Sequence, residues 1–431
     1  MNKRKIYLSY TREDLILWLV CLLQKAFFEI IYISIISQPW QYYGFQDRFS
    51  VYRCIISWLL YIPVPAFICR SKNKGELSSM TIALILNCTY TACLILYEYQ
   101  EETPFIMILV VYFMVLIAAS AVIKPIRFNI GKLKNHNFDV IVNLVGILAG
   151  LSIIFIWAYY AHFRIQLNFD DVYTARMEAR EYSVPTVFVY VRTMARSIVP
   201  VLALYNLHKG RRLLAVYYIF IQFIQFCIDG SKSAFFVMLL GLAVYFFADR
   251  DTKIIPKIPI AMTAGAGLAI AENQIFHTDI FSSFVFRRIM FLPALLNYQY
   301  YELAHIKGID YFRQNLSLLG DSNYTNKIAR EVGQMYYRSA GTNANNGLFA
   351  DAYINLGAIG CFVMPILLVL VLKLIDGASV KLPKSIMVAY AIQLYVTITG
   401  SSFFTIFLTH GAFLMIIILY LLTPDEEDDV S

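Results

Sequence analysis

Two arginines stand in a run that is otherwise apolar, and their charge needs an explanation. Arg192 and Arg196 lie four positions apart, so a helix places them on the same face. Like charges at this spacing repel, and a charged side chain inside a membrane costs at least about 2.5 kcal/mol unless it meets a partner or a water-filled cavity. Both arginines therefore require an anion. It is either a carboxylate of another helix, such as Glu272 or Asp229, or a phosphate-bearing ligand.

A second cationic position is the turn Asp229-Gly-Ser-Lys232-Ser233, which joins two apolar runs. Backbone N–H groups at the start of the helix that follows, together with Lys232, could hold an anion. A plain hairpin turn between two membrane spans would have the same composition. Both interpretations stay open at this point.

The third region is a long polar segment, residues 276–346, which mixes charged residues with apolar and aromatic runs and is therefore predicted to be folded. Within it, Arg287 and Arg288 precede an aromatic-rich stretch that predicts a helix lying on the membrane face or covering a cavity. Guanidinium groups match phosphate oxygens bidentately. Tyr298 and Tyr301 could stack on sugar rings or could belong to the aromatic belt of the membrane interface.

Groups that could accept a proton are scattered along the chain. The possible general bases are Glu272, His277, Asp279, Asp321 and Asp351. Each also has a structural interpretation as a helix cap, an interfacial hydrogen-bonding group or an ion-pair partner. Lys25 and Glu29 are four residues apart and are predicted to pair with each other. No HExxH or Asp-x-Asp pattern is present, so the sequence does not require a metal.

The elements that must position these residues are membrane spans. Hydrophobic residues make up 59% of the 431 positions and charged residues only 15%, which leaves too little polar surface for a soluble domain. A span needs about 20 apolar residues. Twelve segments are predicted to be spans: 14–36, 49–68, 77–97, 104–123, 139–161, 184–206, 213–229, 231–248, 258–276, 347–372, 385–400 and 403–422. The predicted fold class is an all-α polytopic membrane protein of about 12 transmembrane helices, forming a single domain.

The basic residues indicate the orientation of these spans. Lys and Arg gather in alternate connections, whereas the connection that begins at Glu98 carries three glutamates. By the positive-inside rule both termini face the cytoplasm, including the acidic tail 424–431, and the segment 276–346 forms a large extracytoplasmic loop with interfacial helices.

Composition also excludes several functions. The net charge of +7 does not indicate a nucleic-acid partner, because the basic residues sit in short connections between spans rather than in a stripe. The seven cysteines lie within or at the ends of apolar runs, so neither a disulfide framework nor a CxxC metal site is predicted. No cofactor is implied.

Three stretches are similar to one family. They are Phe286-Arg287-Arg288-Ile-Met-Phe-Leu-Pro293-Ala-Leu-Leu-Asn297-Tyr298-Gln-Tyr300-Tyr301-Glu302, Gly230-Ser-Lys232-Ser233 and Asn345-Asn346-Gly347-Leu-Phe-Ala-Asp351-Ala-Tyr353-Ile-Asn355-Leu-Gly357-Ala-Ile-Gly360. Together with one large outer loop before the last three spans, they make the chain resemble the Wzy-type polymerases. Those integral-membrane enzymes join lipid-linked oligosaccharide repeat units into O-antigen or capsular polysaccharide.

The resemblance implies a fold similar to the C-type glycosyltransferases (GT-C), a substrate on undecaprenyl diphosphate, and transfer at the outer face of a bacterial inner (plasma) membrane without a nucleotide sugar or metal. In such a transfer, cationic donors stabilise the departing diphosphate and a carboxylate or imidazole takes a proton. The expected catalytic residues are Arg287, Arg288, Glu272, His277 and Asp351. The expected substrate-binding residues are Arg192, Arg196, Lys232, Arg338, Tyr298, Tyr301 and Asn345.

Two other functions fit the same features. A ligase of the O-antigen type would move finished glycan from undecaprenyl diphosphate to another acceptor. A transporter (flippase) of lipid-linked oligosaccharide would also suit charged residues within spans, although the large folded outer loop fits it less well. The expected partners are the lipid-linked oligosaccharide, the lipid bilayer and a regulator of chain length.

Overall fold

The computed structural model describes residues 11–100, 103–127, 138–165, 178–179, 181–230, 232–247, 253–337 and 341–423. Every regular element in these residues is a helix. Most are α-helices. Three of the four π-helical stretches adjoin an α-helix directly, and in each of them one residue is inserted into the helical turn.

Nine helical segments of the described chain are long and apolar enough to cross a membrane. They are α1 with η1 (Arg12–Ile31 and Tyr32–Ile36), α2 with α3 (Val51–Tyr61 and Pro63–Ser71), α4 with η3 and α5 (Leu77–Leu84, Ile85–Tyr90 and Thr91–Tyr99), α6 (Thr103–Val122), α7 (Phe138–Tyr159), α9 (Thr186–His208), α10 (Arg212–Asp229), α13 with η4 and α14 (Ile280–Ser282, Ser283–Phe291 and Leu292–Lys307) and α16 (Phe349–Ala378). The chain is therefore a helical polytopic membrane protein.

Eight of the twelve predicted spans are among these nine, and the other four are shorter or more polar helices. They are α11 (Lys232–Phe247), α12 (Lys257–Phe276), α17 (Lys384–Thr399) and α18 (Ala412–Leu422). The predicted span 403–422 is divided, because the short η6 (Thr405–Thr409) ends before α18 begins and Gly411 between them has a φ of +75°.

The ninth segment was not predicted as a span. Residues 280–307 fall in the long polar segment of the sequence, where an interfacial helix was expected, yet their length and composition also suit a membrane crossing. Phe286 in η4 meets Phe28 in the second half of α1, with the ring centroids 5.4 Å apart. The first part of this segment therefore packs within the helix bundle rather than beside it.

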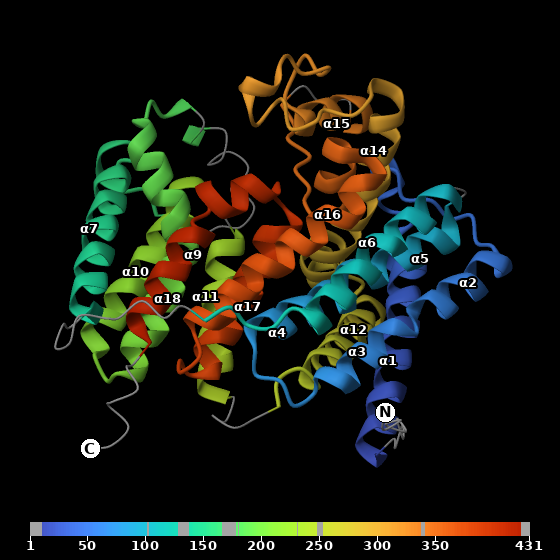
Figure 1. The fold of residues 1–431 in the computed structure, drawn as a ribbon, viewed down its shortest axis with the longest axis horizontal. Helices are drawn as coiled ribbons and strands as arrows, with labels where there is room; N and C mark the ends of the chain where they lie inside the picture. The colour runs from blue at the N-terminus through green and yellow to red at the C-terminus, as the bar shows by residue number, and fades with distance from the viewer. Residues whose placement is uncertain are drawn as a thin grey trace, which may run out of the picture.

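The helices form two groups joined by a central layer. In Figure 1, α7, α9, α10, α11 and α18 stand on one side and α1, α2, α3, α5 and α6 on the other, with α4, α16 and α17 between them. The segment that begins with α4 has 94% of its apolar window buried, which identifies it as the central helix. The segment around α14 and α15 (Ile328–Tyr337) rises at the end opposite the start of α1 and the end of α18.

Residues 308–337, which follow α14 and include α15, are called the outer segment because they lie outside the long apolar helices. They are attached to the bundle at a break in α16. Gly357 has a φ of +58°, a conformation that glycine adopts without steric cost, and it interrupts the helical hydrogen bonding. Two carbonyls just before the break accept instead from the outer segment. Asp310 N–H donates to the Ile354 carbonyl at 2.9 Å and Tyr311 N–H to the Asn355 carbonyl at 3.0 Å. The break therefore fixes the outer segment on the bundle.

Candidate functional site

The two arginines of the apolar run converge on one carboxylate, where the first half of α9 meets the end of α10. Arg196 forms an ion pair with Asp229, and the Arg192 Nη2 lies 3.7 Å from the same Asp229 oxygen. The three side chains are between 17% and 25% exposed. Of the two acids named from the sequence as partners, Asp229 is confirmed, whereas Glu272 is engaged elsewhere.

This cluster of Arg192, Arg196 and Asp229 contains two positive charges and one negative charge. Its net charge is therefore +1. The Nε of Arg196 is buried and has no hydrogen-bond partner among the described residues. Asp229 is the last residue of α10, where the helix dipole disfavours a carboxylate, and the two guanidinium groups contribute to its stabilisation. Gly230 ends the helix with a φ of +62°. The cluster is therefore a cationic position with unsatisfied capacity for an anion.

His410 lies beside this cluster and was not singled out by the sequence. Its Nε2 is 3.0 Å from the Ser401 hydroxyl, and the Arg196 guanidinium is close enough to act on the ring electrostatically. The next residue, Gly411, packs against Met194 of α9. A single histidine in an apolar run has no spacing signal, so only the packing of the 400–411 segment against α9 identifies it.

Asp351 anchors the other end of that segment. Its Oδ2 accepts the Phe403 N–H at 2.8 Å, and its Oδ1 accepts the Asn355 amide at 3.0 Å. The side chain is 5% exposed. Of the structural interpretations offered from the sequence, the hydrogen-bonding one fits Asp351, because both of its oxygens already accept a hydrogen bond. It positions the segment that carries His410.

Arg287 occupies a buried position in η4 and lies against aromatic rings. Its guanidinium carbon is 3.7 Å from the centroid of the Trp40 ring and 5.8 Å from that of Tyr43, and the residue is 5% exposed. Such a contact between a cation and a ring is worth about 2 kcal/mol when desolvated. No carboxylate of the described chain lies within 4.0 Å of it, and its Nε has no hydrogen-bond partner there. Arg288, the next residue, is exposed.

The sequence did not identify Trp40 and Tyr43 as contacts of Arg287. They are nearly 250 positions away, and no local pattern links an aromatic pair after one span to an arginine in another. Trp40, Tyr42 and Tyr43 also pack on one another.

The two acids before η4, Glu272 and Asp279, have structural contacts, whereas His277 is exposed. Both oxygens of Glu272 accept the Phe281 N–H, the closer at 3.0 Å, and one also accepts the Thr278 hydroxyl. Glu272 thereby caps the first turn of α13, as an acid at a helix start does favourably. His277 is exposed in the turn, with a φ of +53°, and Asp279 accepts the Ser283 hydroxyl at 3.1 Å.

The remaining predicted residues are dispersed. Tyr298 is buried and donates to the Cys93 carbonyl at 3.2 Å, and Tyr301 packs on Tyr353 with centroids 4.8 Å apart. Asn345 is exposed, whereas its neighbour Asn346 is buried and donates to the Asn297 Oδ1 at 3.0 Å. Asp321 is also exposed. Arg338 lies outside the described residues, and of Lys232 only the backbone, which begins α11, is described.

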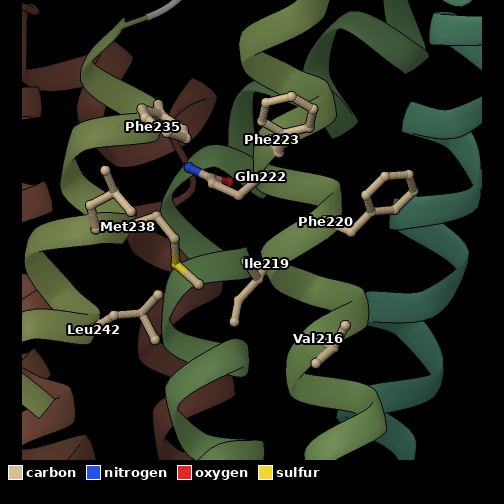
Figure 2. Close-up of a pocket in the computed structure, with 9 residues that line it drawn as sticks. Val216, Ile219, Phe220, Gln222, Phe223, Phe235, Met238 and Leu242 are labelled. Atoms are coloured by element: carbon tan, nitrogen blue, oxygen red, sulfur yellow. The ribbon is translucent and has the colours of Figure 1, made fainter. Parts of the chain in front are cut away.

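An apolar groove runs along the helix pair α10 and α11, below the cationic cluster. It has a volume of about 300 Å³, and its lining is Val216, Ile219, Phe220, Gln222, Phe223, Phe235, Met238, Leu239 and Leu242. Figure 2 shows the aromatic rings of Phe223 and Phe235 at one end and Leu242 and Val216 at the other, with the Gln222 amide between the two helices. Val216 is 62% exposed and Phe220 46%, so the groove opens sideways from the bundle.

A separate charged group lies between α1, α2 and α5 and is largely buried. The Lys25 ammonium forms an ion pair with Glu29, as predicted from their spacing, and a second with Glu98 at 2.6 Å. Ser57 donates to the same Glu98 oxygen at 2.6 Å, and the Trp58 ring lies 4.2 Å from the ammonium. Glu98 was assigned to an outer acidic connection, and that assignment was wrong: it is 0% exposed, because α5 continues through it and turns its side chain inward.

No three His, Cys, Asp or Glu side chains come together as a possible metal site in the described part of the chain. The described residues therefore present two kinds of chemistry: cationic groups near the ends of spanning helices, and a lateral apolar groove along α10 and α11. Comparison with family models, with curated proteins and with solved structures finds no match to this chain.

Proposed function

We propose that the chain is a membrane glycosyltransferase that polymerises undecaprenyl-diphosphate-linked oligosaccharide repeat units at the outer face of a bacterial inner membrane. In this proposal its fold is of the GT-C type. The observations that support the proposal are the cluster of Arg192, Arg196 and Asp229, which has one positive charge in excess, and an apolar groove along α10 and α11 whose lining begins about two helical turns from Asp229. A lipid diphosphate needs this combination.

The groove supplies the place for the polyprenyl chain. Its volume of about 300 Å³ is at the lower end of the range for small-molecule sites, which suits part of a chain whose remainder lies in lipid. Phe223, at its outer end, precedes Asp229 by six residues, about 9 Å along the helix. A polyprenyl chain lying in the groove therefore brings its diphosphate to the level of the two arginines.

In the proposed reaction, the protein must stabilise the negative charge on the departing diphosphate more than it must activate the diphosphate as a leaving group. A hydroxyl oxygen of one repeat unit attacks the anomeric carbon of the growing chain, the bond from that carbon to the diphosphate oxygen breaks, and undecaprenyl diphosphate leaves with the electron pair. Arg192 and Arg196 stabilise the negative charge that develops on the diphosphate. The proton of the hydroxyl passes to a base, for which we propose His410.

His410 suits this role better than the acids named from the sequence. Glu272 caps a helix and Asp351 holds the Phe403 N–H, so neither carboxylate is available without loss of a structural contact. His410 lies near Arg196, and the hydrogen bond between its ring and the Ser401 hydroxyl would orient the imidazole. Arg287, held by Trp40, and the exposed Arg288 form a second cationic position for the incoming or growing lipid-linked chain.

The test is reconstitution of the full chain with lipid-linked repeat units extracted from cells that lack it. Wild-type protein should convert them into a ladder of polymer and release undecaprenyl diphosphate without added metal or nucleotide. Loss of one charge-stabilising donor costs about 10²- to 10³-fold in rate, so R196A should show that loss, and R196K, which keeps the charge but not the planar fork, an intermediate one.

The same two helices offer a matched control at their other end. Arg211 pairs with Asp139 at 2.6 Å near the junction of α9 and α10, so R211A removes an equivalent arginine–aspartate pair far from the proposed site. It should polymerise normally. Equal losses in R211A and R196A would refute the assignment of the site. Finished but unattached polymer in the deletion cells would indicate a ligase, and repeat units left on the cytoplasmic leaflet a transporter.

A further inference from the structure

A small basic cavity lies at the end of the bundle opposite α15, where three connections meet (Figure 1). Its walls come from the turn between α3 and α4, from the residues before α12 and from the start of α17. The volume is about 180 Å³, and four of the lining residues are lysines: Lys72, Lys74, Lys253 and Lys384. Segments up to about 300 positions apart in the sequence thus bring their positive charges to one point.

Two of these four charges have an acidic partner among the described residues. The Lys72 ammonium lies 2.6 Å from Asp14 and the Lys253 ammonium 3.1 Å from Glu13. Within the described residues, Lys74 and Lys384 have no acidic partner within 4.0 Å. The nearby Glu76 is occupied by Lys373 at 2.7 Å. Counted over the described residues, the cavity therefore holds two lysines without an acidic partner.

Gly75 allows Lys384 to approach the turn that carries Lys74. A Cβ added at this position would lie 2.5 Å from the Lys384 Cε and 3.2 Å from its ammonium nitrogen. The backbone of Gly75 has no positive φ that would demand glycine, so close approach of the lysine is the physical reason for the small residue. Positive charges that lie close together repel one another unless an anion lies between them.

We propose that this cavity binds the phosphate group of an anionic phospholipid headgroup. Lysines act on phosphate as point charges, and basic pockets between spanning helices on the cytoplasmic side are suited to lipid headgroups. The volume of about 180 Å³ has room for several water-sized groups and therefore for a phosphate. Met80 and Ile254 provide apolar lining beside the charges. The proposal does not depend on the transferase function.

Binding can be measured by thermophoresis of the full chain in an uncharged detergent. Three probes are titrated separately: short-chain phosphatidylglycerol, short-chain phosphatidylcholine and inorganic phosphate. The wild type should bind phosphatidylglycerol more tightly than the other two. Because a lysine near an anionic headgroup contributes about 1 kcal/mol, the pair K74Q/K384Q should weaken phosphatidylglycerol binding about 25-fold. G75A keeps all four charges but displaces Lys384, so it should weaken binding about fivefold.

The control is K257Q, since Lys257 is an exposed lysine at the start of α12 that does not line the cavity. It should bind as the wild type does. A loss in K257Q equal to that in K74Q/K384Q would mean diffuse attraction and would overturn the site, as would unchanged binding in K74Q/K384Q. Inorganic phosphate that binds as tightly as phosphatidylglycerol, with the same dependence on Lys74 and Lys384, would overturn the lipid assignment in favour of a soluble phosphate.

Discussion

Replacement of Lys25 by methionine tests whether the enclosed Lys25–Glu29–Glu98 group stabilises the bundle. Methionine matches the length of the lysine stem but has no charge. The lysine is 0% exposed, and its removal leaves two carboxylates facing each other, one 1% and the other 21% exposed. Loss of one partner of a buried ion pair costs about 3–5 kcal/mol, because the remaining charge stays buried without compensation. K25M should therefore lower the free energy of unfolding by about that amount.

The measurement is unfolding of the purified chain in mixed micelles with increasing sodium dodecyl sulfate, followed by tryptophan fluorescence. A loss of about 3–5 kcal/mol raises the unfolding equilibrium constant by about two to three and a half powers of ten. The control is K257M, in which an exposed lysine of α12 is changed in the same way. Its unfolding free energy should stay within about 0.5 kcal/mol of the wild-type value.

The triple variant K25M/E29Q/E98Q provides the decisive comparison. Neutral glutamines remove both uncompensated charges, and the amide oxygen of the new glutamine in α5 can still accept the Ser57 hydroxyl that now donates to Glu98 at 2.6 Å. Neutral replacement of a buried ionic group is often close to neutral in stability. The triple variant should thus be clearly more stable than K25M. The reasoning is refuted if K25M is as stable as K257M, or if the triple variant is no more stable than K25M.

Two further predictions concern single positions outside this group. A Cβ on Gly347 would lie 2.0 Å from the Ile398 carbonyl oxygen and 2.3 Å from that of Ser401, so G347A should lower the melting temperature markedly. The control is G341A, where a Cβ meets nothing within 4 Å and the melting temperature should not change. Equal melting temperatures of the two variants would contradict this prediction. In the outer segment, burial raises the pKa of Glu331, but hydrogen bonds from Lys307, the Asn326 N–H and Thr325 outweigh it and lower that pKa to about 2. This lowered pKa contributes stability that is present above the ordinary value of 4.5 and is lost as the pH falls through about 2, so thermal unfolding between pH 5 and 2 should vary less in E331Q than in the wild type.

Much of the fold could be predicted from the sequence, because membrane insertion depends on local composition. Runs of about 20 apolar residues identified eight of the nine long apolar segments. The 280–307 segment was not predicted as a span, because Arg287 and Arg288 interrupt its apolar run. The structure accommodates Arg287 within the bundle by burying it against Trp40. The division of 403–422 depends on one conformation at Gly411, which no hydropathy pattern records.

What the sequence by itself determined are relations within one helix. The spacing of Lys25 and Glu29 determined their pairing, and the spacing of Arg192 and Arg196 determined that both need one anion, because about 3.6 residues per turn place residues i and i+4 together. Tertiary structure alone decided the partners that come from other helices: Glu98 for Lys25, Asp229 rather than Glu272 for the arginines, and His410 beside them. Tertiary structure alone also formed the groove along α10 and α11 and the four-lysine cavity. Such contacts join residues tens to hundreds of positions apart, and side-chain packing between helices, which has no period along the chain, selects them.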